Sequence, residues 1–205
     1  MNFLKRIALL LGFVAIAGGL AACSNSKSST NSSQSSKKVS KVNKTSKNSK
    51  TLILYFSLSG STKEAAEYIQ KETGADMIRL QPVKAYKGYD DAAKRGDRER
   101  RKNIHPALKT KIPNFSKYEN VIIGYPTWWS RPPMLISTLF DDYNFKGKNV
   151  TAFTTSMSTP IGPSEQYIRR MAQNEGADFV NGIRYDNNKS EVRQWLKKIG
   201  LLKEN

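Results

Sequence analysis

The stretch Leu52-Ile53-Leu54-Tyr55-Phe56-Ser57-Leu58-Ser59-Gly60-Ser61-Thr62 decides how the rest of the chain is interpreted. Its first five residues form an apolar run that predicts a buried strand, and a helix-patterned segment begins near Lys63. This order places backbone N–H groups at a helix N-terminus, where unpaired donors and the helix dipole favour an anion. Two interpretations stay open: a phosphate-binding turn, or an ordinary helix cap formed by Ser59 or Ser61.

Strands and helices are predicted to alternate along the chain from Thr51 onward. Apolar runs predict further strands over 76–80, 121–125, 150–154 and 179–183. Helical spacing predicts helices over 62–72, 90–102, 133–142, 163–175 and 190–199. Several of the strands are apolar almost throughout, so we expect one α/β domain over 51–205 whose five-stranded parallel sheet is doubly wound, with helices on both faces.

Three unusual loops follow the first, third and fourth predicted strands: loop one (57–62), loop two (125–133) and loop three (155–162). The carboxyl ends of parallel strands meet at one edge of a sheet, so one ligand can touch all three loops. Loop two contains the adjacent Trp128 and Trp129. Adjacent side chains do not readily both point inward, so we expect at least one Trp to contact the ligand; the alternative is packing in the core.

These loops resemble those of the flavodoxin family, and most closely those of the group that has a Pro-x-Trp-Trp loop. Ser57-x-Ser59-Gly60-Ser61-Thr62 resembles the family's phosphate-binding turn, Gly124-Tyr125-Pro126-Thr127-Trp128-Trp129 resembles the loop on the flavin ring, and Phe153-Thr154-Thr155-Ser156 through Gly162 resembles the loop on the ring's other side. The resemblance covers Thr51 to about Leu201. It implies a flavodoxin-like sheet of order 2-1-3-4-5, noncovalent FMN and electron transfer.

The cofactor-binding residues implied by this resemblance are Ser57, Leu58, Ser59, Gly60, Ser61, Thr62, Pro126, Thr127, Trp128, Trp129, Ser130, Thr155, Ser156, Met157, Ser158 and Gly162. Loop three departs from the related group, because Met157, Ser158 and Pro160 stand where glycines are common, and the backbone is less free to approach the ring. The Met157 thioether is an alternative contact at the ring edge. No catalytic residue or metal ligand set is predicted, and the single histidine, His105, is expected in an exposed loop.

The first 23 residues are interpreted as an export signal. Lys5 and Arg6 precede an apolar run over 7–22, and Leu20-Ala21-Ala22-Cys23 resembles a bacterial lipobox. This resemblance implies that residues 1–22 are removed and that Cys23 carries a lipid on its sulfur; the alternative is a plain cleavable signal. Cys23 is the only cysteine, so no intramolecular disulfide is possible.

Residues 23–50 are interpreted as the lipidated cysteine followed by a disordered tether rich in Ser, Lys and Asn, because they contain too few apolar side chains to form a core. The predicted location is therefore extracytoplasmic, with a lipid anchor in the bacterial cell membrane. The chain has a formal net charge of +17, but we place nucleic acid last among its partners because an exported protein seldom meets it.

The predicted function is that of a membrane-tethered FMN protein that carries electrons between an unknown donor and an unknown acceptor at the cell envelope. Two alternatives stay open: an NAD(P)H-dependent quinone or flavin reductase on the same fold, and a flavodoxin-like binding module without flavin. The absence of a second dinucleotide motif favours the carrier.

The basic stretch 84–111 is rich in lysine and arginine. We favour a solvated face, but if this stretch lies near the ring, its charge should stabilise the reduced, anionic flavin and raise its potential.

Overall fold

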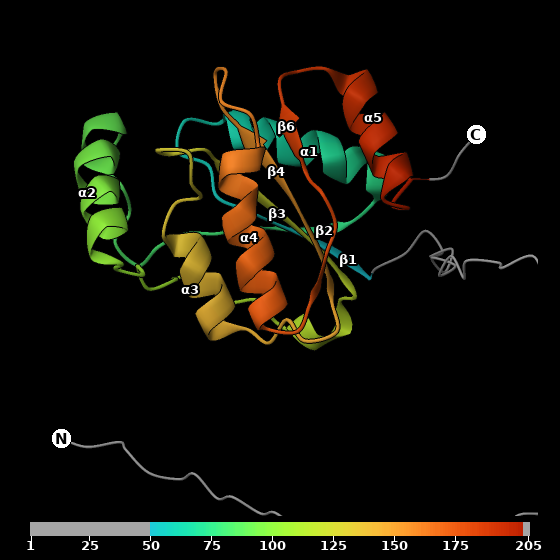
Figure 1. Ribbon diagram of the computed structural model, residues 1–205, viewed down its shortest axis with the longest axis horizontal. Coiled ribbons are helices and arrows are strands. Elements are labelled where there is room, and N and C mark those ends of the chain that lie inside the picture. The colour runs from blue at the N-terminus through green and yellow to red at the C-terminus, as the bar shows by residue number, and fades with distance from the viewer. Residues whose placement is uncertain (1–49, 203–205) are drawn as a thin grey trace, which may run out of the picture. The chain divides into compact units, whose positions relative to one another are not determined.

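The computed structural model describes residues 50–202, so the predicted signal, Cys23 and the tether up to residue 49 lie outside the described residues. Within 50–202 a parallel sheet has the strand order β2-β1-β3-β4-β5, and β6 also pairs with β4. Helices cover both faces of this sheet (Figure 1). The predicted doubly wound α/β fold and its strand order are confirmed. No helix among these residues is long and apolar enough to cross a bilayer.

The observed elements agree closely with the predicted ones. The strands are β1 Thr51–Tyr55, β2 Asp76–Arg79, β3 Asn120–Pro126, β4 Asn149–Thr155, β5 Asp178–Phe179 and β6 Ile183–Tyr185. The helices are α1 Ser61–Thr73, α2 Tyr89–Lys102, the 3-10 helix η1 Phe115–Lys117, α3 Leu135–Asp142, α4 Gly162–Asn174 and α5 Lys189–Lys198.

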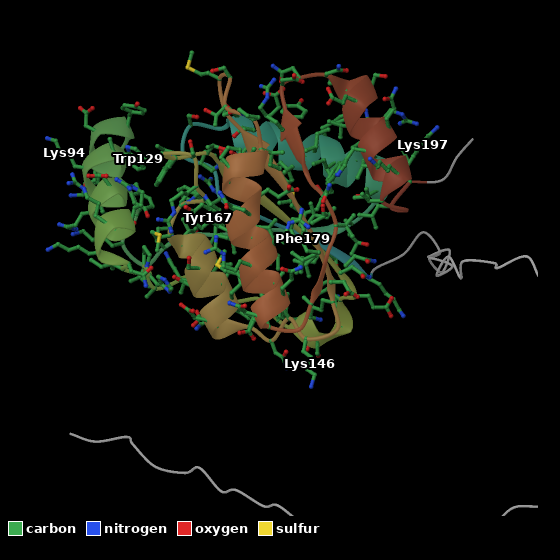
Figure 2. All side chains as sticks on the ribbon, in the orientation of Figure 1. Lys94, Trp129, Lys146, Tyr167, Phe179 and Lys197 are labelled. Atoms are coloured by element: carbon green, nitrogen blue, oxygen red, sulfur yellow. The ribbon has the colours of Figure 1, made fainter. Side chains whose placement is uncertain are left out.

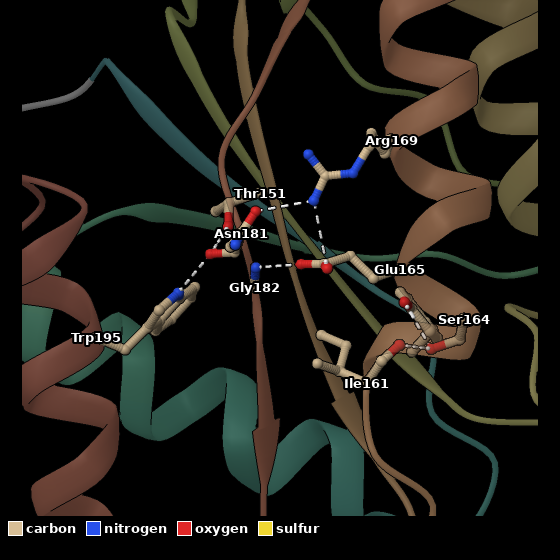
Figure 3. Close-up of polar contacts among 9 residues, drawn as sticks. Thr151, Ile161, Ser164, Glu165, Arg169, Asn181, Gly182 and Trp195 are labelled. Atoms are coloured by element: carbon tan, nitrogen blue, oxygen red, sulfur yellow. Dashed lines mark hydrogen bonds and ion pairs between the residues drawn. The ribbon is translucent and has the colours of Figure 1, made fainter.

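The fifth strand differs from the prediction because the run 179–183 is divided between β5 and β6, and the short helix η1 was not predicted. Figure 3 shows the polar contacts made by Asn181 and Gly182, which lie between these two strands. The carbonyl oxygen of Asn181 accepts hydrogen bonds from the Trp195 indole (3.0 Å) and the Thr151 hydroxyl (3.4 Å), and the amide of Gly182 donates to the Glu165 carboxylate. A Cβ on Gly182 would lie 2.0 Å from the Ala152 carbonyl oxygen. Side chains from neighbouring elements therefore take the place of strand pairing over these residues.

The two faces of the sheet have separate apolar cores because side chains alternate along each strand. Leu52 and Leu54 of β1 face the core that α3 and α4 cover. Ile53, between them, faces the core that α1 and α5 cover, where Trp195 is buried as expected. The central strands are thus buried on both sides, which explains their continuous apolar runs.

Helix α2 lies to one side of the sheet, in the long connection between β2 and β3 (Figure 1). Its buried face is charged rather than apolar, which explains its weak hydrophobic pattern. The Arg95 guanidinium donates to Glu99 (2.6 Å), and the Tyr86 hydroxyl donates to the other oxygen of Glu99 (2.7 Å). Burial and this carboxylate raise the pKa of Tyr86, so the phenol stays protonated and continues to donate.

Asp76 provides a pH-dependent contribution to stability at the start of β2. Its carboxylate accepts from the Tyr118 hydroxyl (2.6 Å) and the Lys117 ammonium (3.2 Å), and these hydrogen bonds lower the pKa of Asp76. A folded-state pKa below the unfolded value means that this stability is present at neutral pH and lost as pH falls through the folded pKa. We expect Asp76→Asn to cost under about 1 kcal/mol at pH 6, because the pair is half exposed. In urea unfolding the difference from wild type should shrink below about pH 4; a difference independent of pH would contradict this account.

Candidate functional site

The structure joins loops one, two and three at the carboxyl edge of β1, β3 and β4. The Thr62 hydroxyl of loop one lies 2.7 Å from the Thr155 hydroxyl of loop three, and both residues are buried. In loop two, the Thr127 amide donates to the Thr155 carbonyl (2.9 Å), and the Thr127 hydroxyl lies 2.6 Å from the Thr154 hydroxyl. Thr62, Thr127 and Thr155 of the predicted set are therefore linked to one another directly or through the backbone.

Loop one presents the uncapped N-terminus of α1. The N-cap position is Gly60, with φ of +111°, and no side chain accepts a hydrogen bond from the first amides of the helix. This φ lies in the region that favours glycine. Ser59 and Ser61 are exposed and do not cap the helix, so the ordinary-cap interpretation is wrong. Backbone donors at the positive end of the α1 dipole are thus available to an anion.

The predicted residues of loop one divide into two groups. Ser57 is buried, and its hydroxyl accepts from the Gly60 amide (3.1 Å), while Leu58 packs against the core. These side chains shape the loop, whereas Ser59, Gly60 and Ser61 face outward. Sequence reasoning missed Arg79 at the end of β2, whose guanidinium donates to the Ser57 carbonyl (2.9 Å). Its charge adds to the attraction for an anion; the pairing of β1 with β2 is the signal that could have found it.

Loop two contains a tight turn with strained backbone. The amide and carbonyl of Trp128 bond to those of Arg131, at 2.9 and 3.0 Å. The two residues between them, Trp129 and Ser130, have φ of +47° and +58°. A bulky side chain rarely adopts such a φ, and strain of this kind is often found at ligand sites.

The two tryptophan rings of this turn differ in burial. Trp128 packs edge-to-face against Phe56 and Tyr86, with ring centroids 5.6 and 5.3 Å apart, so it is part of the fold. Trp129 is 46% exposed. Two adjacent indoles do not both enter the core, as expected from the sequence, and Trp129 is the one that is free to contact a ligand.

Helix α2 packs directly against the Trp pair. A Cβ added to Gly96 would lie 3.1 Å from Trp128 and 3.3 Å from Trp129, so glycine is what allows this close contact. The Arg100 guanidinium lies 5.7 Å from the centroid of the Trp129 ring. Figure 2 shows Trp129 on the side of α2 that faces the domain. Part of the basic stretch therefore lies beside loop two, and sequence reasoning identified neither Gly96 nor Arg100.

Loop three begins with the buried Thr155 and has an exposed tip at Met157. The Ser156 hydroxyl donates to the Thr159 carbonyl (2.6 Å) and closes the loop. Met157 is fully exposed, and Ser158 is exposed beside it. Gly162 lies in the first turn of α4 without a positive φ, and a Cβ there would contact nothing within 4 Å apart from its chain neighbours, so no contact with a distant segment requires glycine at this position.

Two cavities each touch one of the loops: the larger is lined in part by Arg131 and Pro132 of loop two, and the smaller by Ser57 and Leu58 of loop one. The larger, of about 560 Å³, is bounded by α3, α4 and the segment after α2, and it includes His105, whose Nδ1 lies 2.5 Å from the Asp141 carboxylate. The smaller, of about 190 Å³, adjoins loop one at Ser57 and Arg79. Neither cavity is lined by all of the predicted cofactor-binding residues. Among residues 50–202 no group of three or more potential metal ligands is found.

Comparisons with known proteins agree with this geometry. The family model described as Flavodoxin matches residues 50–199. A putative flavoprotein from Bacteroides eggerthii has 31% identity and a TM-score of 0.67, over 74% of this chain and 98% of its own. A putative flavoprotein from Bacteroides uniformis has 30% identity and a TM-score of 0.66, over 72% and 97%. A flavoprotein from Lactobacillus acidophilus, solved in complex with FMN, has 26% identity and a TM-score of 0.61, over 71% and 97%.

No curated protein sequence matches the chain. The family model nevertheless spans nearly all the residues that the structure describes, and the Bacteroides eggerthii flavoprotein is similar to this chain over almost its whole length. The chain therefore belongs to the flavodoxin family.

Proposed function

We propose that the three loops bind FMN noncovalently and that the protein carries electrons through this cofactor. The observation that carries the proposal is the hydrogen-bonded meeting of loops one, two and three around the uncapped N-terminus of α1. The similarity to the Lactobacillus acidophilus flavoprotein in complex with FMN supports it. Bound FMN supplies the one- and two-electron chemistry, while the protein supplies binding, orientation and electrostatic tuning.

The residues present suit each part of FMN. The exposed hydroxyls of Ser59 and Ser61, with the first amides of α1, suit a phosphate dianion, and Arg79 adds positive charge beside them. The exposed indole of Trp129 offers a flat surface to the isoalloxazine ring. The Thr127 amide is already bonded to Thr155, so the exposed tip of loop three is the better source of backbone donors for the polar edge of the ring.

Incubating the full chain with FMN tests the proposal. We expect FMN fluorescence to be quenched on mixing, and the visible flavin spectrum to stay with the protein through dialysis and gel filtration. Loss of all flavin on dialysis without quenching would overturn FMN binding and leave the flavin-free module. NADH oxidation by the loaded chain alone would instead indicate the reductase.

Trp129→Gly separates ligand contact from folding. We expect FMN affinity to fall about tenfold, from the lost stacking and burial. The free energy of unfolding should change by under about 1 kcal/mol, because glycine relieves the positive φ. The matched variant Trp128→Ala should instead lose about 3 kcal/mol, because it removes a packed ring. Equal FMN affinities for wild type and Trp129→Gly, by fluorescence titration, would contradict the stacking role.

Arg100→Gln tests whether the basic stretch tunes the cofactor. Arg100 lies over Trp129, the residue proposed to stack on the ring, so its charge should stabilise the reduced, anionic flavin. We expect the two-electron midpoint potential to fall by about 30 mV, equivalent to about 1.4 kcal/mol. Spectroelectrochemical titration of the loaded protein measures this. An unchanged or higher potential would show that the stretch acts only as a solvated face.

We further propose that the protein is exported and held at the outer side of the cell membrane by a lipid on Cys23. The signal-like residues 1–22 and the single cysteine after them support this. Mass spectrometry of the mature chain from a bacterial host should find Cys23 as the first residue with a diacylglyceryl mass. Cys23→Ala should move the protein out of the membrane fraction. A mature chain that begins elsewhere, or a free thiol on Cys23, would refute the anchor.

A further inference from the structure

Four cations lie on the outward face of α2, which we call the basic face: Lys94, Arg98, Arg101 and Lys102. All four side chains are exposed. Within residues 50–202, Arg101 pairs with Asp97, but the other three make no ion pair. The opposite face of the helix carries the buried Arg95 and Glu99 pair.

The spacing of these cations does not serve the stability of α2. Lys94, Arg98 and Lys102 follow one another at i,i+4 positions, where like charges repel and destabilise a helix. Other helices of the same domain have opposite charges at that spacing: Lys63 pairs with Glu67 in α1, and Glu165 with Arg169 in α4. An ordinary solvated face mixes both signs in this way. Lys189, Arg193 and Lys197 of α5 repeat this spacing of like charges, but Arg193 there pairs with Glu72 of α1. Among residues 50–202, Lys94, Arg98 and Lys102 of α2 have no such acidic partner.

Its position points to a role in electron transfer. The inner side of α2 contacts Trp129 through Gly96 and Arg100, and Trp129 is the side chain proposed to stack on the flavin. Figure 2 shows Lys94 on the other side of the helix, directed away from the domain. Lys84 and Lys87, just before α2, are also exposed and add to the positive charge of this segment. One helix thus separates a predominantly positive surface, which also includes the exposed Asp90 and the Asp97 partner of Arg101, from the candidate cofactor site.

We propose that the basic face of α2 docks an acidic redox protein that exchanges electrons with the bound flavin. The proposal rests on the FMN-binding function proposed above. Complementary charge steers a protein to its partner and raises the association rate at low ionic strength. The partner is a protein rather than an anionic lipid surface, because the basic face lies next to the site where electrons must enter or leave, and a lipid headgroup exchanges no electrons.

A reduced, acidic [2Fe–2S] ferredoxin is a suitable probe, because plant-type clusters have potentials near −400 mV. Each encounter would oxidise one cluster by one electron and pass that electron to the FMN-loaded full chain. The test variant is Lys94→Glu with Arg98→Glu. The matched control is Lys146→Glu with Lys197→Glu, which makes the same change in net charge on surfaces remote from α2 (Figure 2).

Stopped-flow kinetics give the second-order rate constant for ferredoxin oxidation as ionic strength varies. At about 10 mM salt we expect the α2 variant to react about tenfold more slowly than wild type, and the control to differ by less than about twofold. Near 0.5 M salt the three proteins should converge, because screening removes the attraction. Equal rates for the three proteins at low salt, or equal slowing of both variants, would overturn the proposal.

Two further measurements separate this proposal from its alternatives. Ferredoxin binding to the flavin-free chain, followed by calorimetry at low salt, reports on the basic face even if FMN is not retained; loss of binding only in the α2 variant supports the docking surface independently of the cofactor. Sedimentation with phosphatidylglycerol vesicles tests the lipid. If the α2 variant loses vesicle binding but keeps the wild-type ferredoxin rate and affinity, the basic face is a membrane surface and the proposal is wrong.

Discussion

Replacing Ser61 by aspartate is expected to lower FMN affinity by about 100-fold or more while slightly stabilising the flavin-free protein. Ser61 is the first residue of α1 and is exposed at the N-terminus that we propose holds the phosphate. A fixed negative charge a few ångströms from a phosphate dianion is strongly unfavourable at the effective dielectric of a protein surface. The same charge interacts favourably with the helix dipole, by about 0.5 kcal/mol. Fluorescence titration with FMN and urea unfolding of the flavin-free chain measure the two effects.

Ser190→Asp is the matched control for this experiment. Ser190 is exposed in the first turn of α5, so the new carboxylate gains a similar interaction with a helix dipole. It changes the net charge equally, but α5 is not among the elements that carry the three loops. FMN affinity should stay within about threefold of wild type. If Ser61→Asp binds FMN as tightly as Ser190→Asp, the phosphate does not lie at the N-terminus of α1.

The second large effect is expected for Gly124→Ala, which should destabilise the protein by about 3 kcal/mol. Gly124 is buried in β3, just before loop two, and a Cβ there would lie 2.1 Å from Cζ of Phe153 on the neighbouring strand β4. Phe153 is fully buried, so its ring cannot turn aside without disturbing the core. Urea unfolding at neutral pH measures the loss. A change below about 1 kcal/mol would show that the ring has room that the structure does not indicate.

Gly162→Ala provides the contrast. A Cβ on Gly162 contacts nothing within 4 Å, and its φ is not in the left-handed region. Alanine is the better helix former, but Pro163 follows directly and disfavours a helical conformation for a residue that has a Cβ, so we expect the free energy of unfolding to change by less than about 1 kcal/mol. Gly162 is also one of the predicted cofactor-binding residues. An FMN affinity within about threefold of wild type would show that loop three needs no close backbone approach there.

The folding pattern was largely predictable from the sequence because it depends on local alternation of apolar and polar residues. The apolar runs at 52–56, 121–125 and 150–154 identified the three central strands, and the turns after them identified the edge where the loops meet. The run 179–183 did not reveal its interruption. The groups that hold the Asn181 carbonyl belong to Thr151 and Trp195, which are far from it in the sequence.

The candidate site was predictable in its location but not in the roles of its residues. From the sequence, loop one could be either an ordinary helix cap or a phosphate-binding turn. The structure excludes the cap, because Gly60 is the N-cap residue and no side chain accepts from the first amides of α1. The sequence indicated that Trp128 and Trp129 do not readily both point inward, but it did not indicate which one is exposed. That choice depends on Tyr86, which packs against Trp128, and on Gly96, which lets α2 approach both rings.

The sequence by itself determined the order of strands and helices, the edge of the sheet at which loops one, two and three emerge, and the excess of positive charge. These properties follow from residues that are neighbours in the chain. Only the tertiary structure decided that Trp129 rather than Trp128 is exposed, that Arg79 joins loop one, and that α2 directs Lys94 away from the domain. The physical reason is that each of these outcomes depends on packing and hydrogen bonds between segments that are distant in the chain, and no local pattern records such contacts.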